Sequence, residues 1–174
     1  MGQQFGISYL KEGDKMVGND NLIYKFNEHG LYYEIKDYSN KEIMFALCTV
    51  TLNFDYDTGE LLSVTGFLPL VNAICHNIKI PAFNLGKYSI SMTNIEYLQG
   101  VAYDYSNHFE ESGHYLMKDR LTRVSYDKEN KIILIGIQSP NDNSIKINKN
   151  IICGFDENEN LKYLMLLLDS MIND

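Results

Sequence analysis

One short pattern recurs four times along this chain of 174 residues: an aromatic residue, then Asp or Asn, then a few polar residues, then a β-forming run. Asp or Asn at such a position hydrogen-bonds to the backbone two residues on, and Gly or Asn accepts the left-handed backbone that a tight turn requires. Each copy therefore predicts a hairpin turn that ends one strand and begins the next. The four copies start at Phe26, Tyr56, Tyr126 and Phe155.

The segments beside these turns alternate apolar and polar residues with a period of two, clearest over residues 48–54, 88–93 and 145–148. This alternation is typical of half-buried antiparallel strands. Residues 132–137 are apolar on both faces, which favours a central strand. Residues 161–171 carry a helical stripe, but they directly follow a turn, so we interpret them as a strand to about Leu168.

Two stretches favour helix. Residues 68–79 place Leu70, Val71, Ile74 and Ile78 at helical spacing and stop before Pro81, which predicts a short helix. Residues 106–119 begin with a Ser suited to a helix N-cap and predict one or two helical turns within a loop.

The expected fold is therefore mainly β: an antiparallel curled sheet or a barrel-like sandwich of hairpins, with one or two short helices. A chain of this length buries enough surface for a single domain over residues 1–174. The spacing of the turns also allows two similar halves that meet near residues 87–100.

The charge excludes one class of function. The chain carries 15 basic and 23 acidic side chains, a formal net charge of -8, and such a balance repels phosphate backbones. The one basic cluster, Arg120 and Arg123 near Lys118, has too few charges for a nucleic-acid patch, and we interpret it as a solvated strand face. We expect no nucleic-acid partner.

Cysteine usage and hydropathy bear on location. The three cysteines, Cys48, Cys75 and Cys153, are odd in number and form no C-x-x-C, which favours a reducing compartment over a disulfide scaffold. No apolar run approaches the roughly 20 residues that span a bilayer, and no signal peptide is visible. The expected location is the cytoplasm, without a membrane partner, and the residue usage indicates a gene of low GC content and hence a bacterial source.

The C-terminal third resembles a family of very small prokaryotic proteins. Residues 126–135 read YDKENKIILI and residues 152–161 read ICGFDENENL. The family has a YDxExDxLYI strand followed by a DYDExGNIVGIEIL strand, and the similarity covers about residues 124–170. Because that family is uncharacterised, the resemblance implies two β-hairpins and no activity. Residues 161–168 depart from it, since they lack the Val-Gly-Ile-Glu-Ile pattern.

Side chains that can bind a metal or take part in catalysis are most concentrated over residues 104–114, which hold two histidines and three carboxylates within eleven residues. Imidazole and carboxylate groups suit zinc, iron or manganese. The candidate metal ligands are His108, Glu110, Glu111 and His114. Their spacing matches no standard metal motif, so a solvated polar loop remains the alternative.

Two further motifs lack what their chemistry needs. The stretch 55–60 resembles part of a calcium loop but has neither the glycine at loop position six nor the glutamate at position twelve. Cys75 and His76 are adjacent, and adjacent side chains do not face each other on a helix or strand.

Thirteen tyrosines and eight phenylalanines suggest a binding role. Aromatic side chains line ligand cavities and protein-binding faces, although tyrosine is also a favoured residue of half-exposed strands. The candidate ligand-binding residues are Tyr97, Tyr103, Tyr105 and Tyr115.

The leading functional hypothesis is a non-catalytic bacterial binding protein without a cofactor. Its ligand is either a small apolar molecule in a cavity or a basic protein partner, and an immunity protein against a basic toxin is one form of the latter. The alternative is a small metal-assisted enzyme that uses the 104–114 segment. Exposed edge strands add a homodimer to the expected partners.

Overall fold

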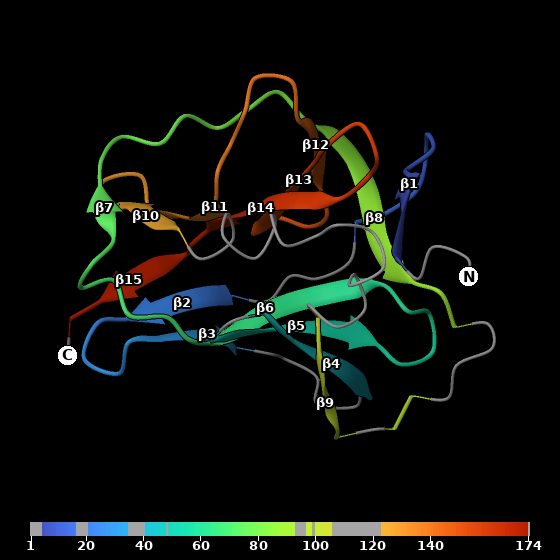
Figure 1. Cartoon of the computed structure of the whole chain (residues 1–174), viewed down its shortest axis with the longest axis horizontal. Helices are drawn as coiled ribbons and strands as arrows, with labels where there is room; N and C mark the ends of the chain where they lie inside the picture. Colours follow the sequence, from blue (N-terminus) through green and yellow to red (C-terminus); the bar gives the residue numbers. More distant parts are fainter. Residues whose placement is uncertain are drawn as a thin grey trace.

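The strands of the protein form two sheets that stack face to face (Figure 1). The computed structural model describes residues 5–16, 21–34, 41–47, 49–92, 97–98, 100–105 and 123–173. In spatial order, the seven-stranded sheet contains β15 (Ser170–Ile172), β2 (Asn21–Lys25), β3 (Gly30–Glu34), β6 (Leu61–Phe67), β5 (Val50–Asp55), β4 (Glu42–Leu47) and β9 (Ala102–Asp104). The eight-stranded sheet contains β1 (Phe5–Tyr9), β8 (Asn84–Ile90), β12 (Asn143–Lys146), β13 (Ile151–Phe155), β14 (Leu161–Leu167), β11 (Ile132–Gly136), β10 (Val124–Asp127) and β7 (Ile74–Cys75).

The mainly β fold is confirmed, and the two stacked sheets do not close into a barrel. The predicted central strand at 132–137 and the predicted strand from Leu161 appear as β11 and β14. The expected antiparallel arrangement holds for most neighbouring pairs, but both sheets are mixed, because four pairs run parallel: β7 with β10, β8 with β12, β15 with β2, and β9 with β4. Each of these pairs joins segments that are far apart along the chain.

The described part of the chain contains no helix, and hence none long and apolar enough to cross a bilayer. The predicted helix over 68–79 is wrong. Its apolar residues do not share one face: Leu70 is buried in the main core, Ile78 is buried in a second cluster, and Val71 is 76% exposed. The segment instead forms a turn and the short strand β7. The second predicted helical stretch, 106–119, lies outside the described residues.

Two five-stranded units have the same topology. In the first unit, the β2–β3 hairpin is followed by the β4–β5–β6 meander, and β6 returns to pair with β3. In the second unit, the β10–β11 hairpin is followed by the β12–β13–β14 meander, and β14 returns to pair with β11. The spatial order is thus 2-3-6-5-4 in one unit and 10-11-14-13-12 in the other. The predicted single domain and the predicted meeting of halves near 87–100 stay predictions.

The likeness of the units extends to backbone detail. A bulge interrupts β5–β6 at Asn53/Phe54 and β13–β14 at Gly154/Phe155, one residue before the turn in each unit. Asp55 and Asp156 begin these turns, and each carboxylate accepts hydrogen bonds from backbone N–H groups within its own turn. All four predicted turns join paired antiparallel strands, but in the copy at Tyr56 the carboxylate that holds the turn is that of Asp55, which follows Phe54, and not that of Asp57.

Each unit also sends its last segment into the other sheet. β7, which follows β6, pairs with β10 of the second unit, and β15, which follows β14, pairs with β2 of the first. Asp169, between β14 and β15, accepts a hydrogen bond from Leu22 N at 2.9 Å and from Asn150 Nδ2 at 2.9 Å. The exchange ties the two sheets together at their edges.

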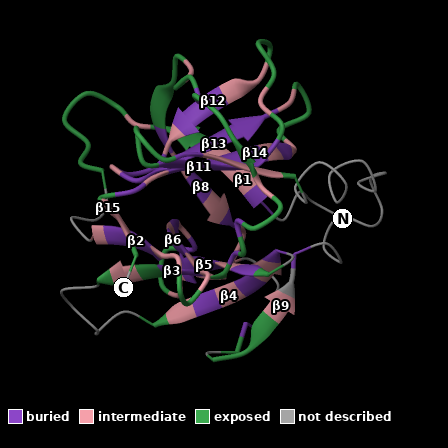
Figure 2. Cartoon of the chain, turned by 90° about the vertical axis from the view of Figure 1, so that its left-hand side faces the viewer, coloured by how far each residue is buried: buried purple, intermediate pink, exposed green. Residues whose placement is uncertain are grey.

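The main core lies between the sheets and draws buried side chains from both, such as Leu52 and Phe54 from one and Ile133 and Leu164 from the other. A smaller cluster lies on the outer face of the eight-stranded sheet. Its members are Ile78, Ile132, Leu134, Ile152, Tyr163 and Met165. Figure 1 shows the segment between β7 and β8 crossing this outer face, and Figure 2 shows how fully β11, β13 and β14 are buried. We call residues 76–83 the strap.

Candidate interaction surface

Three acidic side chains lie on the outer face of the seven-stranded sheet. Glu42 begins β4 and alternates with the buried Ile43, so it points away from the core. Asp55 ends β5 after the buried Phe54, and Glu34 ends β3 on the same face. β5 runs antiparallel to β6 and ends beside the start of β6, whereas the β3–β6 pairing covers Gly30–Phe67 and Leu31–Gly66 near the end of β6. We call Glu34, Glu42 and Asp55 the acidic end.

Glu42 and Asp55 stand directly opposite each other in the β4–β5 ladder. Like charges at opposite positions of an antiparallel pair destabilise the sheet. Partial burial raises the pKa of the Glu42 carboxyl, and the negative charge of Asp55 raises that pKa further. The pair is therefore a local electrostatic conflict within an otherwise regular hairpin.

No described cation relieves this conflict. The three ion pairs among the described residues join Lys25 to Glu28, Lys87 to Glu60 and Lys149 to Asp169, and none includes Glu42 or Asp55.

Backbone N–H groups of the turn beside this pair donate hydrogen bonds to one oxygen of the Asp55 carboxylate. Asp55 Oδ1 accepts hydrogen bonds from Asp57 N at 3.0 Å and Thr58 N at 2.7 Å, and so holds the turn. Gly59 in this turn has a φ of 72°, where a β-carbon would be strained. Asp57 is exposed and adds a further negative charge beside the acidic end. The β4–β5 hairpin thus presents the opposed carboxylates of Glu42 and Asp55, with Asp57 exposed in the adjoining turn.

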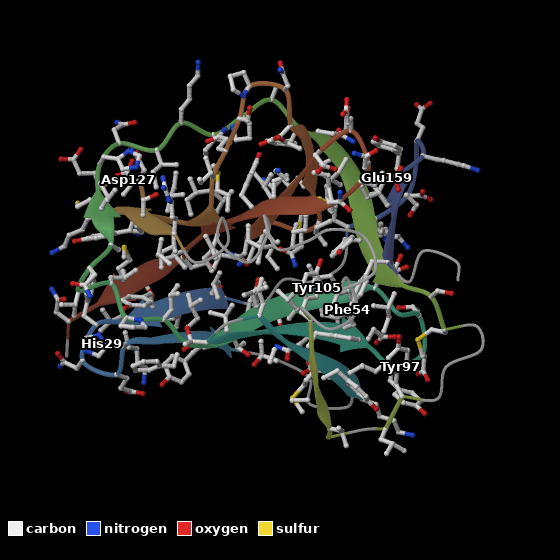
Figure 3. The ribbon with its side chains drawn as sticks, in the orientation of Figure 1. His29, Phe54, Tyr97, Tyr105, Asp127 and Glu159 are labelled. Carbon is white, nitrogen blue, oxygen red and sulfur yellow. The ribbon has the colours of Figure 1, made fainter. Side chains whose placement is uncertain are left out.

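Three of the four predicted ligand-binding tyrosines lie in an aromatic cluster. Tyr97 and Tyr105 are 3% and 1% exposed, and Tyr103 is half-buried. The ring centroid of Phe45 lies 5.8 Å from that of Tyr97, 5.5 Å from that of Tyr103 and 6.5 Å from that of Tyr105. Figure 3 shows Tyr105 beside Phe54, between the sheets, with Tyr97 lying farther out. These rings pack against one another at short range.

The same cluster contains a buried pair of hydroxyl groups. Tyr88 Oη and Tyr105 Oη lie 2.6 Å apart, and both side chains are 1% exposed. Burial raises the pKa of each phenol well above its usual range. Both hydroxyls therefore stay protonated and act as hydrogen-bonding groups within the core.

A shallow surface pocket, little larger than a single water molecule, lies elsewhere, beside β8 and the turn before β6. It is lined by Leu10, Lys15, Met16, Glu60, Leu61, Gly86, Lys87 and Ile147. Lys87 Nζ and Glu60 Oε1, both in its lining, are 2.5 Å apart and form an ion pair. Among the described candidates, Tyr97, Tyr103 and Tyr105 do not line this pocket.

The predicted metal ligands His108, Glu110, Glu111 and His114 lie outside the described residues, as does Tyr115. Within the described ranges, no three His, Cys, Asp or Glu side chains gather closely enough to hold a metal ion. The metal hypothesis for 104–114 stays a prediction.

Comparison with known proteins adds no name. No protein-family model matches the chain, and no curated protein matches it. The resemblance of residues 124–170 to a small prokaryotic family stays a prediction.

Sequence reasoning missed the pairing of Glu42 with Asp55, although a signal was present. Leu47 and Val50 flank a two-residue connection, and they pair in the observed hairpin. Counting outward from that connection places residue 42 opposite residue 55, because paired numbers in a hairpin have a constant sum. The register of the hairpin, and not a residue motif, places the two carboxylates opposite each other.

Proposed function

We propose that this protein is a non-catalytic binding protein that presents the acidic end to a basic protein partner. The observation that carries the proposal is the opposed pair Glu42 and Asp55, which no described cation neutralises. Natural sequences tend to keep local conflicts of this kind where function requires them. A lysine or arginine from a partner would relieve the repulsion on binding, and a net charge of -8 would speed the encounter.

Two features favour a protein partner over a small ligand. The described tyrosines among our ligand-binding candidates, Tyr97, Tyr103 and Tyr105, pack against Phe45, and the described pocket is small and lies elsewhere. Drug-sized ligand pockets are typically about 300–1,000 Å³ and mostly enclosed. An immunity-type complex with a basic bacterial toxin is the form of this function that fits the charge and the rigid β scaffold.

The test uses a fluorescently labelled peptide of twelve lysines as the probe and a peptide of twelve glutamates as its counterpart. Binding is followed by fluorescence anisotropy at low and moderate salt. We expect the wild-type protein to bind the lysine peptide and not the glutamate peptide. We expect the double variant Glu34→Gln/Glu42→Gln to weaken binding at least about fivefold, because it removes two of the three local carboxylates.

The matched control removes the same amount of charge elsewhere. Glu129 and Glu157 are exposed, belong to turns of the second unit, and make no ion pair with another described residue. The variant Glu129→Gln/Glu157→Gln should change the affinity by less than about twofold, since its charges lie away from the contact. Equal losses in both double variants would show that only net charge matters, and the proposed site would then be wrong.

A further inference from the structure

The four sheet edges are protected to different degrees. β7, β9 and β15 are two or three residues long, and short edge strands are one way in which proteins prevent pairing with another chain. β1 is five residues long, its register with β8 contains no bulge, and its sequence Phe-Gly-Ile-Ser-Tyr has neither a charge nor a proline. Among the described edges, β1 is therefore the one that lacks the usual protection.

The backbone of β1 presents hydrogen-bonding groups on its outer side. Leu10 N donates to Leu85 O at 3.0 Å, one residue beyond the pair Tyr9–Gly86. Hydrogen-bonded and non-hydrogen-bonded positions alternate in an antiparallel pair, so Ser8 turns its N–H and C=O groups toward β8. Ile7 and Tyr9 consequently turn theirs away from β8, toward an edge that no described strand pairs with.

A second copy of β1 fits this edge. If two β1 strands pair antiparallel about a twofold axis at Ser8, Ile7 of each copy faces Tyr9 of the other at a hydrogen-bonded position. The side chains then form two aromatic–β-branched pairs, which stabilise antiparallel sheets. Tyr9 is 55% exposed in the single chain and would be covered in the pair.

The remaining positions of this register are also compatible. Gly6 of one copy faces Leu10 of the other, and a β-carbon added at Gly6 would meet no atom within 4 Å, so the strands are free to approach. No residue from Gly6 to Leu10 carries a charge, so the overlap opposes no like charges despite the acidic chain. We propose that the protein self-associates through β1 into a twofold dimer with one continuous sixteen-stranded sheet.

The first test measures mass against concentration by sedimentation equilibrium. The wild-type protein should shift from 20.0 kDa toward twice that mass as concentration rises. Tyr9→Lys places a charge on the edge and should raise the dimer dissociation constant at least about tenfold. Leu98→Lys is the matched control, because Leu98 is 62% exposed, lies outside β1 and changes the net charge equally.

The second test determines whether the twofold axis of the dimer passes at Ser8. Ser8 is exposed and would face its own copy at a non-hydrogen-bonded position, where Cα atoms lie about 4.5 Å apart, within disulfide range. In a Cys75→Ser background, Ser8→Cys should give a disulfide-linked dimer in a glutathione redox buffer much faster than Ser139→Cys, an exposed control in the 137–142 loop. Circular dichroism confirms that each variant is folded.

Two results would overturn the proposal: a wild-type protein that stays at 20.0 kDa up to about 1 mM, or equal cross-linking of Ser8→Cys and Ser139→Cys. An equal effect of Tyr9→Lys and Leu98→Lys would also reject β1 as the contact. The proposed dimer contact is on the eight-stranded sheet, and the proposed surface for a basic partner is on the seven-stranded sheet. A negative result for one proposal therefore does not contradict the other.

Discussion

The first and second units share a strand order, a bulge position and a turn chemistry, but they differ on the face that points away from the core. At equivalent places, Ser63 and Thr65 of β6 correspond to Tyr163 and Met165 of β14. In the first unit Asn53 Nδ2 donates to Ser63 Oγ at 2.9 Å and to Thr65 Oγ1 at 3.0 Å. In the second unit the outer residues are apolar and pack under the strap.

The difference shows how one topology serves two roles. Gly154 replaces Asn53 because the Tyr163 ring lies where a side chain at residue 154 would project. Tyr163 Oη then reaches Ser144 Oγ at 2.7 Å, and Ile78 of the strap joins the cluster. The inner faces of both units build the common core, and the outer faces are left to vary. One outer face carries a second core and the other carries the acidic end.

The largest expected effect comes from removing an outer-face side chain in each unit. Met165→Ala should lower the free energy of unfolding by about 2–5 kcal/mol, because Met165 is fully buried and the substitution leaves a cavity. The equivalent Thr65→Ala should cost only about 1 kcal/mol, the value of one hydrogen bond. Urea unfolding measures both. Equal losses would mean that the outer faces of the two units contribute equally to the free energy of unfolding.

A smaller effect is expected where the strap is attached. Asp127 Oδ2 accepts hydrogen bonds from Asn130 Nδ2 at 2.8 Å and from Ile78 N of the strap at 2.9 Å. The bonds from Asn130 first, and then the bond from Ile78, lower the pKa of Asp127 from the usual 3.8 to about 2. Figure 3 shows Asp127 at the strap side of the eight-stranded sheet. The stabilisation is complete above pH 3.8 and is lost as the pH falls toward 2.

Asp127→Asn should therefore be less stable than wild type at neutral pH, and the difference should shrink between pH 3.8 and 2. Urea midpoints measured across this pH range provide the check. Asp142→Asn is a suitable control, because Asp142 lies in the neighbouring loop and contacts Ser139 N, not the strap. A difference that persists unchanged at pH 2 would contradict the role of the Asp127 charge.

The smallest effect belongs to the acidic end, and its sign is opposite. The pKa of Glu42 is raised above the usual 4.5, so its charge destabilises the folded state at neutral pH, and the penalty disappears as the pH falls. Glu42→Gln should stabilise the protein by less than about 1 kcal/mol at pH 7 and have no effect well below pH 4.5. Thermal unfolding at both pH values measures this.

The control for this prediction is Glu34→Gln, since Glu34 faces Asn21 across the β2–β3 ladder and not a second carboxylate. It should leave the stability nearly unchanged. A destabilising Glu42→Gln would show that the carboxylate is needed for folding, and the argument for a functional conflict would fail.

The sequence predicted local structure well where a single segment holds the information. Asp55 and Asp156 act within their own turns, and the alternation of Val50, Leu52 and Phe54 marks the buried face of β5 without reference to any other strand. The helix predicted at 68–79 failed for the opposite reason. Its helical spacing was real, but Leu70 and Ile78 are buried in different clusters that only the assembled sheets create.

The candidate site also combines features that the sequence shows with features that only the tertiary structure shows. The carboxylates of the acidic end are visible in the sequence, and the hairpin register that opposes Glu42 to Asp55 follows from local counting. The environment that raises the pKa of Glu42 is not local, because burial depends on neighbouring strands. The tyrosines show the same limit: their number was clear, but their mutual packing depends on strands from both sheets.

By itself, the sequence determined the hairpin turns, the β-rich class and the negative charge, because turn chemistry and period-two alternation act over a few neighbouring residues. Only the tertiary structure decided that β7 and β15 exchange between the sheets, that the strap covers one outer face, and that β1 is left as an edge. These features depend on pairing between segments distant in sequence. Many such pairings suit the same local pattern, and packing in three dimensions selects among them.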